Sequence, residues 1–142
     1  FRGYIGFYNA SVPEPVIEQT WARCLGARDG FLGLVAVDAG GAVVGIANVL
    51  FHPSTWSATS YCYLEDLFVD PDRRAQGVGR ALIEAVYREA DARGATRTYW
   101  TTQAGNEAAR ALYAKLAPLE QPDAAGYYPE FECLASVVGL RS

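Results

Sequence analysis

The stretch that decides the fold is residues 61–82, which read YCYLEDLFVDPDRRAQGVGRAL. Residues 61–69 are aromatic, branched or apolar apart from two acids, as expected of a long strand, and the Asp-Pro-Asp run at 70–72 ends it. A loop with two glycines, Gly77 and Gly79, follows and leads into a helix. The stretch therefore predicts a strand that passes through a glycine-bearing loop directly into a helix.

The helix predicted after this loop covers residues 77–93, and Gly94 ends it. A strand at 96–102 and a second helix at 106–116 follow. Strand, helix, strand and helix in this order predict a parallel pair of strands joined by a crossover helix. The inward stripe expected of the first helix is mostly apolar and consists of Leu82, Ala85, Val86, Glu89 and Ala90.

The residues before this unit predict an antiparallel hairpin. Residues 31–37 and 42–51 have the composition of strands, and an Asp-Ala-Gly-Gly turn lies between them. Hairpin and crossover together indicate a mixed α/β (α+β) fold, a sheet with helices on both faces. The further elements expected are a helix at 13–25 ended by Gly26, a weaker helix within 1–9 and a last strand at 131–140.

The composition is that of a globular protein, and residues 1–142 are predicted to form a single domain. Apolar residues make up 51% and charged residues 20%, an ordinary balance. No apolar run reaches the roughly 20 residues of a membrane helix, so no membrane partner is expected. The net charge of −4 disfavours nucleic acid as a partner and weakly favours cationic ligands.

Cysteine and histidine usage limits the chemistry further. Cys24, Cys62 and Cys133 have no metal-binding spacing, so no metal site is expected, and free thiols indicate a reducing, cytoplasmic setting. A single histidine excludes His-rich metal sites. Pro53 beside His52 indicates a loop or strand-end residue rather than a catalytic base.

The loop at 73–80, RRAQGVGR, carries the sharpest chemical signal. Gly77 and Gly79 let the backbone approach a ligand closely, and the N–H groups that open the next helix attract an anion. The pattern is neither a Walker loop nor the dinucleotide-binding G-x-G-x-x-G. The residues alone leave two interpretations open, a pyrophosphate-binding loop and an ordinary two-glycine helix start.

Glu65 and Asp66 are consecutive acids inside an apolar strand. Adjacent strand residues point to opposite faces unless the strand is bulged, and a buried unpaired carboxylate is costly. One interpretation is that a carboxylate binds a cationic amine and accepts its proton, because an alkylamine is protonated at neutral pH. The other is a pair of salt bridges, for example to Arg73 or Arg97.

Three linked motifs resemble those of the GNAT superfamily of N-acetyltransferases. Arg74, Gly77 and Gly79 match the coenzyme A loop Q/R-x-x-G-x-G/A, after a strand that ends in Leu-Phe-Val-Asp-Pro. The run NEAARALY at 106–113 resembles the second motif, N-x-x-A-x-x-L-Y. The resemblance covers roughly residues 31–116. Within the superfamily, the strand sequence YLEDLFV is similar to that of the small histone and polyamine acetyltransferases.

The resemblance implies a mostly antiparallel central sheet and transfer of acetyl from acetyl-CoA to a primary amine. The acceptor would be a polyamine, a small amine or a protein lysine, attacking directly in a ternary complex. Glu65 and Asp66 would serve the amine, and Tyr113 would protonate the departing thiolate. The residues implied in binding acetyl-CoA are Leu67, Phe68, Val69, Arg74, Ala75, Gln76, Gly77, Val78, Gly79, Arg80, Asn106 and Tyr113.

Alternatives remain open for two of these residues and for the whole chain. From the residues alone, Tyr113 is equally a core aromatic, and Asn106 is a helix N-cap. If the chain is not an acetyltransferase, the alternatives are a non-catalytic acetyl-CoA-binding sensor and a phosphate-binding regulatory domain of another fold. The second motif around Asn106 argues against the last of these.

The chain departs from the family pattern at both ends. Residues 114–118, AKLAP, stand where the family continues with Lys and then Gly-Phe, so the pairing of the tail is not predicted. The family's first strand is expected to be missing at the N-terminus. Small relatives often pair, and aromatic residues in the tail favour a homodimer; they are Tyr127, Tyr128 and Phe131.

Overall fold

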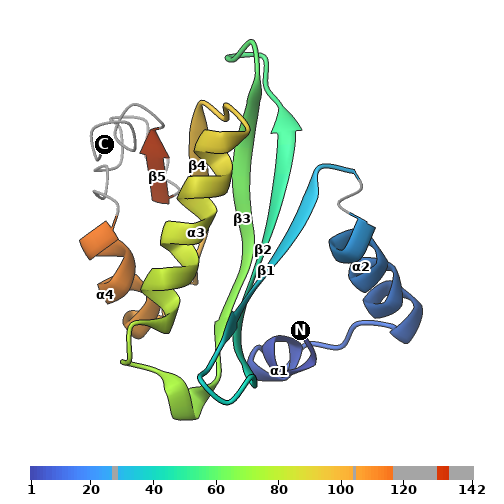
Figure 1. Cartoon of the computed structure of the whole chain (residues 1–142), viewed down its shortest axis with the longest axis vertical. Coiled ribbons are helices and arrows are strands. Elements are labelled where there is room, and N and C mark those ends of the chain that lie inside the picture. The colour runs from blue at the N-terminus through green and yellow to red at the C-terminus, as the bar shows by residue number, and fades with distance from the viewer. Residues whose placement is uncertain (27–28, 104, 117–130, 135–142) are drawn as a thin grey trace. The chain divides into compact units, whose positions relative to one another are not determined.

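The structure is a computed structural model that describes residues 1–26, 29–103, 105–116 and, for the backbone only, 131–134. Figure 1 labels the α-helices and strands. In chain order the elements are α1 (Arg2–Phe7), α2 (Glu14–Gly26), β1 (Phe31–Val37), β2 (Val43–Pro53), β3 (Ser60–Val69), the 3-10 turn η1 (Pro71–Arg73), α3 (Val78–Ala92), β4 (Arg97–Trp100), α4 (Glu107–Leu116) and β5 (Phe131–Leu134).

The chain forms two compact units, and each is described in turn. The first consists of Phe1–Leu50 with Glu65–Val86, and the second of Phe51–Leu64 with Tyr87–Ser142. Strands β2 and β3 and helix α3 each contribute residues to both units.

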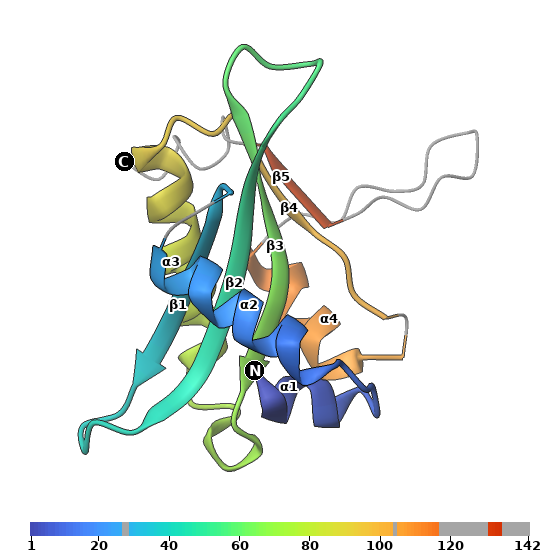
Figure 2. The same cartoon turned by 90° about the vertical axis from the view of Figure 1, so that its right-hand side faces the viewer.

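In the first unit, helices cover both faces of the sheet. Strands β1 and β2 pair antiparallel, with Gly33 opposite Asn48. Helix α2 lies across the face of the sheet on which these two residues stand (Figure 2). A Cβ at Gly33 would come within 3.0 Å of Cys24 on α2. Gly45 is three residues from Asn48 and therefore faces the other way, where its Cβ would lie 3.0 Å from Leu82 on α3. Both glycines thus allow a helix to pack closely on the sheet.

In the second unit, β4 lies between β3 and β5. The pairing of β3 with β4 is parallel, from Tyr61 opposite Arg97 to Tyr63 opposite Tyr99, and that of β4 with β5 is antiparallel. The parallel pair confirms the predicted crossover through α3. With the antiparallel β1–β2 hairpin, the described pairings confirm the predicted mixed fold.

The core of the second unit is built around Trp100, whose side chain is 1% exposed. Its ring lies 6.3 Å from that of Tyr87 on α3 and 5.3 Å from that of Tyr113 on α4. The inward stripe predicted for α3 was partly wrong, because Ala85 and Glu89 are only half-buried. The residues of α3 that are buried are Leu82, Ile83, Val86, Tyr87 and Ala90.

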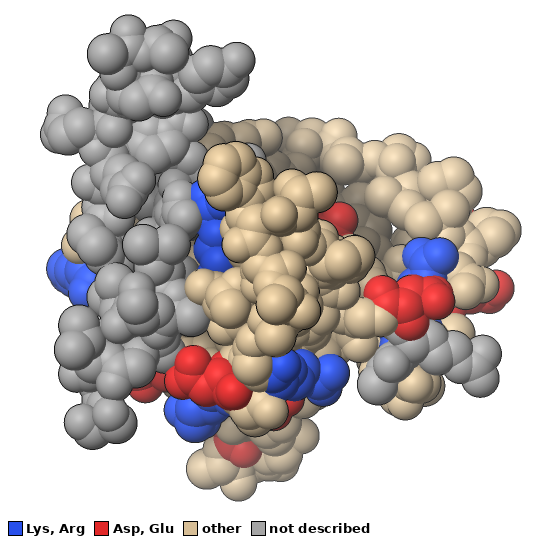
Figure 3. All heavy atoms as spheres, turned by 90° about the horizontal axis from the view of Figure 1, so that it is seen from above, with Lys and Arg blue, Asp and Glu red and all other residues tan. Residues whose placement is uncertain are grey.

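The remaining boundaries follow the predictions closely. His52 lies near the end of β2, as expected of a strand-end residue. The last strand, expected at 131–140, is seen at Phe131–Leu134, and its remainder lies outside the described residues. In the part of the chain that is described, no helix is long and apolar enough to span a membrane. On the face shown in Figure 3, basic and acidic side chains lie interspersed among uncharged ones.

The close packing at Gly45 generates a stability prediction. In Gly45→Ala, the new methyl would lie 3.1 Å from the backbone carbonyl oxygen of Phe68 and 3.0 Å from Leu82. Overpacking of this kind costs about 1–3 kcal/mol, and we expect that loss in the free energy of unfolding in urea. The control is Gly6→Ala on α1, where a Cβ meets nothing within 4 Å. Equal stabilities of the two variants would contradict this account of the packing.

Candidate functional site

The loop between β3 and α3 has a backbone shaped to present N–H groups. Ala75 and Gly77 both have positive φ, +59° and +85°, which is unusual for an alanine. Among the described residues, the N–H groups of Ala75, Gln76 and Gly77 have no backbone acceptor. The first N–H of α3 that bonds back is that of Ala81, to the Gly77 carbonyl at 3.0 Å. The loop and the first turn of α3 thus form a run of donors suited to an anion.

Two arginines hold this loop to the rest of the first unit. The Nε of Arg74 donates to the Val69 carbonyl at 3.2 Å, and its guanidinium lies 5.0 Å from the centre of the Phe7 ring. Arg73 forms a salt bridge of 3.1 Å with Asp38 in the β1–β2 turn. Arg73 is therefore occupied by Asp38, rather than by the acids of β3 as one interpretation of the sequence suggested.

Arg80 differs from these two arginines. It lies on the first turn of α3 with an exposed side chain and forms no salt bridge within the described chain. A bound anion would therefore meet main-chain donors and one guanidinium on the same turn. At the other end of the loop, the side chains of Leu67, Phe68 and Val69 are half-buried where β3 ends.

The two acids of β3 lie in opposite environments. Glu65 is exposed, whereas Asp66 is buried, with 8% of its surface accessible. Partial loss of solvation, followed by the charge of neighbouring Asp66, raises the pKa of Glu65 above its usual value. Glu65 is thus the acid that solvent reaches, and its raised pKa makes it a stronger base once ionised.

Asp66 is held by neutral donors from two other elements. The amide Nδ2 of Asn48 on β2 donates to the Asp66 Oδ2 at 2.9 Å. The Tyr4 hydroxyl on α1 also bonds to this carboxylate, and burial together with the Asp66 charge raises the pKa of Tyr4. Neither partner was predicted from the sequence, because no local motif links residues so far apart in the chain.

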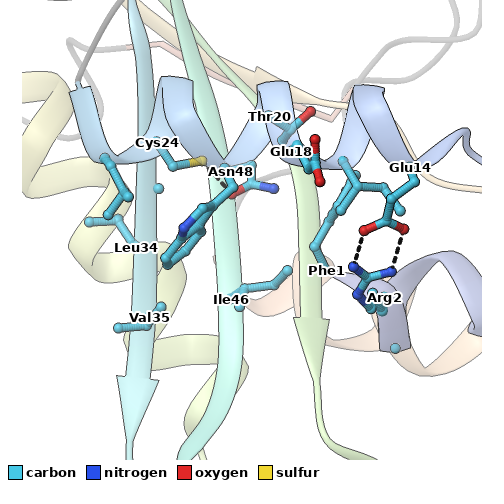
Figure 4. Close-up of a pocket in the computed structure, with 15 residues that line it drawn as sticks. Phe1, Arg2, Glu14, Glu18, Thr20, Cys24, Leu34, Val35, Ile46 and Asn48 are labelled. Atoms are coloured by element: carbon cyan, nitrogen blue, oxygen red, sulfur yellow. Dashed lines mark hydrogen bonds and ion pairs between the residues drawn. The ribbon is translucent and has the colours of Figure 1, made fainter.

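A cavity of about 690 Å³ opens beneath α2 in the first unit. Figure 4 shows Cys24 and Asn48 together on its wall, where the Cys24 Sγ lies 3.8 Å from the Asn48 Oδ1. An ion pair between Arg2 and Glu14 lies at another part of the lining. The apolar part of the lining includes Ile17, Trp21, Leu25, Leu34, Val35 and Ile46.

The second unit carries the other predicted site residues. The Asn106 Oδ1 accepts a hydrogen bond from the Ala109 N–H at 3.2 Å, so Asn106 is the N-cap of α4. Tyr113 is 6% exposed and packs against Trp100, as a core aromatic would. Asn106 is therefore a helix N-cap and Tyr113 a core aromatic, and any contact of either residue with a ligand would be in addition to these roles.

His52 belongs to an aromatic cluster that the sequence did not reveal. Its ring lies near those of Tyr61 and Tyr99, and the guanidinium of Arg97 lies over both tyrosines. Its Nδ1 is 2.9 Å from the Pro53 carbonyl oxygen, which can only accept, so in the neutral ring Nε2 accepts from the Tyr99 hydroxyl at 2.8 Å. With both ring nitrogens engaged, His52 is poorly placed to act as a base.

Comparisons with known proteins agree on one family. The model of the acetyltransferase (GNAT) family matches residues 4–117. The D-amino-acid N-acetyltransferase HPA3 of Saccharomyces cerevisiae is 36% identical over 118 residues, which are 82% of this chain and 73% of that protein. The thialysine N-epsilon-acetyltransferase of Bos taurus is 33% identical over 111 residues, 78% of this chain and 64% of that protein.

Solved structures show the same fold. The crystal structure of a probable acetyltransferase has a TM-score of 0.74 with this chain at 21% identity, covering 88% of this chain and 83% of the other. This likeness supports the topology described above.

Proposed function

The chain belongs to the acetyltransferase (GNAT) family, and on that premise we propose that the loop between β3 and α3 binds the pyrophosphate of acetyl-CoA while Glu65 prepares an amine acceptor. The observation that carries the proposal is the run of N–H groups from Ala75 to Gly77, just before α3, for which the described part of the chain offers no backbone acceptor. These donors and the exposed Arg80 match the charge of a pyrophosphate.

Family membership confirms the predicted class of enzyme, an N-acetyltransferase that acts on amines. Members of this family use acetyl-CoA as the acetyl donor. The predicted choice of acceptor was a polyamine, a small amine or a protein lysine. The named relatives act on amino groups of amino acids, so we place an amino acid or a small derivative of one first among these.

The chain's own residues supply the steps around the donor. Residues 67–69 would align the pantetheine arm as an added strand, and a backbone N–H near Leu67 would stabilise the thioester oxygen as it gains charge. Asn106 would contact the arm in addition to capping α4. Acetyl-CoA supplies an activated thioester, and Tyr113 would return a proton to the departing sulfur.

Glu65 would prepare the nucleophile. An alkylamine has a pKa of about 10.4 and arrives protonated at neutral pH, so it cannot attack until a base removes a proton. An exposed carboxylate with a raised pKa binds the cation and accepts that proton, directly or through water. The mild net negative charge of −4 would favour the approach of cationic acceptors.

Two finer predictions accompany this proposal. A cytoplasmic location is supported by free thiols, since Cys24 and Cys62 form no disulfide and burial raises the pKa of Cys62 to about 12. A homodimer was predicted from the aromatic tail, whose side chains lie outside the described residues. Both stay predictions.

The direct test is a screen of amines for release of free coenzyme A from acetyl-CoA. We expect turnover with amino acids or small amines, and the screen includes polyamines and lysine peptides as competing acceptors. Binding of acetyl-CoA without turnover on any amine would instead identify a non-catalytic acetyl-CoA-binding sensor.

The loop assignment predicts how glycine substitutions affect binding of acetyl-CoA. A ligand bound only by the folded state raises the melting temperature. In Gly77→Ala, a side chain at a φ of +85° strains the loop and turns its donors away, so most of the ligand-induced rise should disappear. Gly41→Ala in the β1–β2 turn is the matched control, because Gly41 has the same φ and equally open space around a Cβ. A full ligand-induced rise in Gly77→Ala would refute the assignment.

The role of Tyr113 predicts a separation of rate from affinity. Tyr113→Phe removes one hydroxyl and keeps the ring against Trp100, so the dissociation constant of acetyl-CoA should stay nearly unchanged. Loss of a general acid should lower kcat by about 10²–10⁴-fold. Leu116→Ala, which leaves a cavity beneath the same helix, is the contrasting variant. It should lower the free energy of unfolding but leave the kcat of the folded enzyme nearly unchanged. Normal kcat in Tyr113→Phe would leave Tyr113 a core aromatic only.

A further inference from the structure

The buried carboxylate of Asp66 is the feature that the proposed function leaves unexplained. A charge at 8% exposure is costly unless it is paired or hydrogen-bonded. Within residues 1–26, 29–103 and 105–116, no Lys or Arg forms a salt bridge with it. Its partners are neutral donors, the Asn48 amide at 2.9 Å and the Tyr4 hydroxyl. The site therefore stabilises a carboxylate without a neutralising cation.

The bond to Asp66 fixes the orientation of the Asn48 amide. Asn48 is 5% exposed and stands opposite Gly33, which has no side chain to displace it. Its Oδ1 faces the Cys24 Sγ at 3.8 Å (Figure 4), and its Nδ2 faces Asp66. The reversed amide would turn an oxygen toward a carboxylate, and two acceptors repel. The amide therefore holds the carboxylate in one position.

We propose that Asn48 is a positioning residue for acetyl transfer, whose amide fixes the position of the carboxylate of Asp66, the residue next to Glu65 in β3. The inference rests on the proposed function, because it assumes that Glu65 accepts the proton of the amine. Asp66 does not touch the acceptor in this scheme. It acts through Glu65, the next residue of β3, which points to the exposed face.

Two titratable groups that face Asp66 are uncharged near neutral pH. Tyr4 faces Asp66 from α1, and Cys24 faces it from α2 through Asn48. Burial, with the Asp66 charge, raises the pKa of the Tyr4 hydroxyl and of the Cys24 thiol alike, and both are neutral below their pKa. Asp66 thus supplies the local charge that acts on Glu65, where it adds to desolvation in raising the pKa of Glu65.

The sign of the expected effect follows directly. A negative charge beside Glu65 favours its protonated form, so removing that charge lowers the pKa of Glu65 and lets it act as a base at lower pH. Without the Asn48 donor, the Asp66 carboxylate loses its fixed position. Its charge then acts less on Glu65, and the acidic limb of kcat/KM should move to lower pH.

The experiment measures kcat/KM against pH for five variants of the full chain, with an amine from the screen. Glu65→Gln identifies the limb and should abolish it. Asp66→Asn should shift the limb to lower pH, and Asn48→Leu and Asn48→Ala should shift it in the same direction by less. Cys24→Ala is the matched control, because it removes the contact on the other side of the amide and leaves the bond to Asp66, so its limb should not move.

The position of a pH limb does not depend on the fraction of folded enzyme, so a merely structural role of Asn48 would lower activity without moving the limb. Two variants are used at Asn48 so that the test can still be made if one of them fails to fold. An unshifted limb in Asp66→Asn, or in an active Asn48 variant, overturns the proposal. A limb that persists in Glu65→Gln overturns it as well. Absence of turnover by the parent chain on every amine overturns the proposed function itself.

Discussion

Successive residues of a strand point to opposite faces, and in β3 this constraint separates two adjacent carboxylates. Glu65 is placed in contact with solvent, and Asp66 is driven under the helices of the first unit. Burial of Asp66 then requires donors, which come from Asn48 on β2 and Tyr4 on α1. The positions of three elements are thereby tied to one carboxylate. A pair of solvent-exposed acids would impose no such requirement on the rest of the unit.

Much of the fold could be predicted because its signals are local. The strand, loop and helix from β3 to α3 follow from composition, turn residues and the spacing of apolar side chains, and the observed bounds differ by only one or two residues. The inward face of α3 was less predictable. Ile83 and Tyr87 are buried and Ala85 is only half-buried, so the buried residues cover a wider arc of the helix than the narrow stripe that was predicted.

The sequence identifies the acids of the candidate site but not the residues that hydrogen-bond to them. Glu65 and Asp66 stand out in an apolar strand, yet the sequence does not show which face each takes or what holds Asp66. Asn48 and Tyr4 lie 18 and 62 positions away, and their meeting depends on how α1 and β2 pack. Arg73 shows the same limit, since its partner is Asp38 in a distant turn. The roles of Asn106 and Tyr113 toward a ligand stay predictions.

The two halves of the proposed chemistry draw on different parts of the chain. At the loop, the groups that would meet acetyl-CoA are mostly main-chain N–H groups, and their directions are set by positive φ at Ala75 and Gly77. Arg74 serves to anchor the loop to Val69.

Near Glu65, by contrast, the environment depends on the identity of buried side chains such as Asn48. Substitutions that keep the backbone shape would therefore preserve donor binding, whereas changes around Asp66 would alter the handling of the amine. This division allows one fold to keep its donor while acceptors differ, as the names of the D-amino-acid and thialysine enzymes suggest.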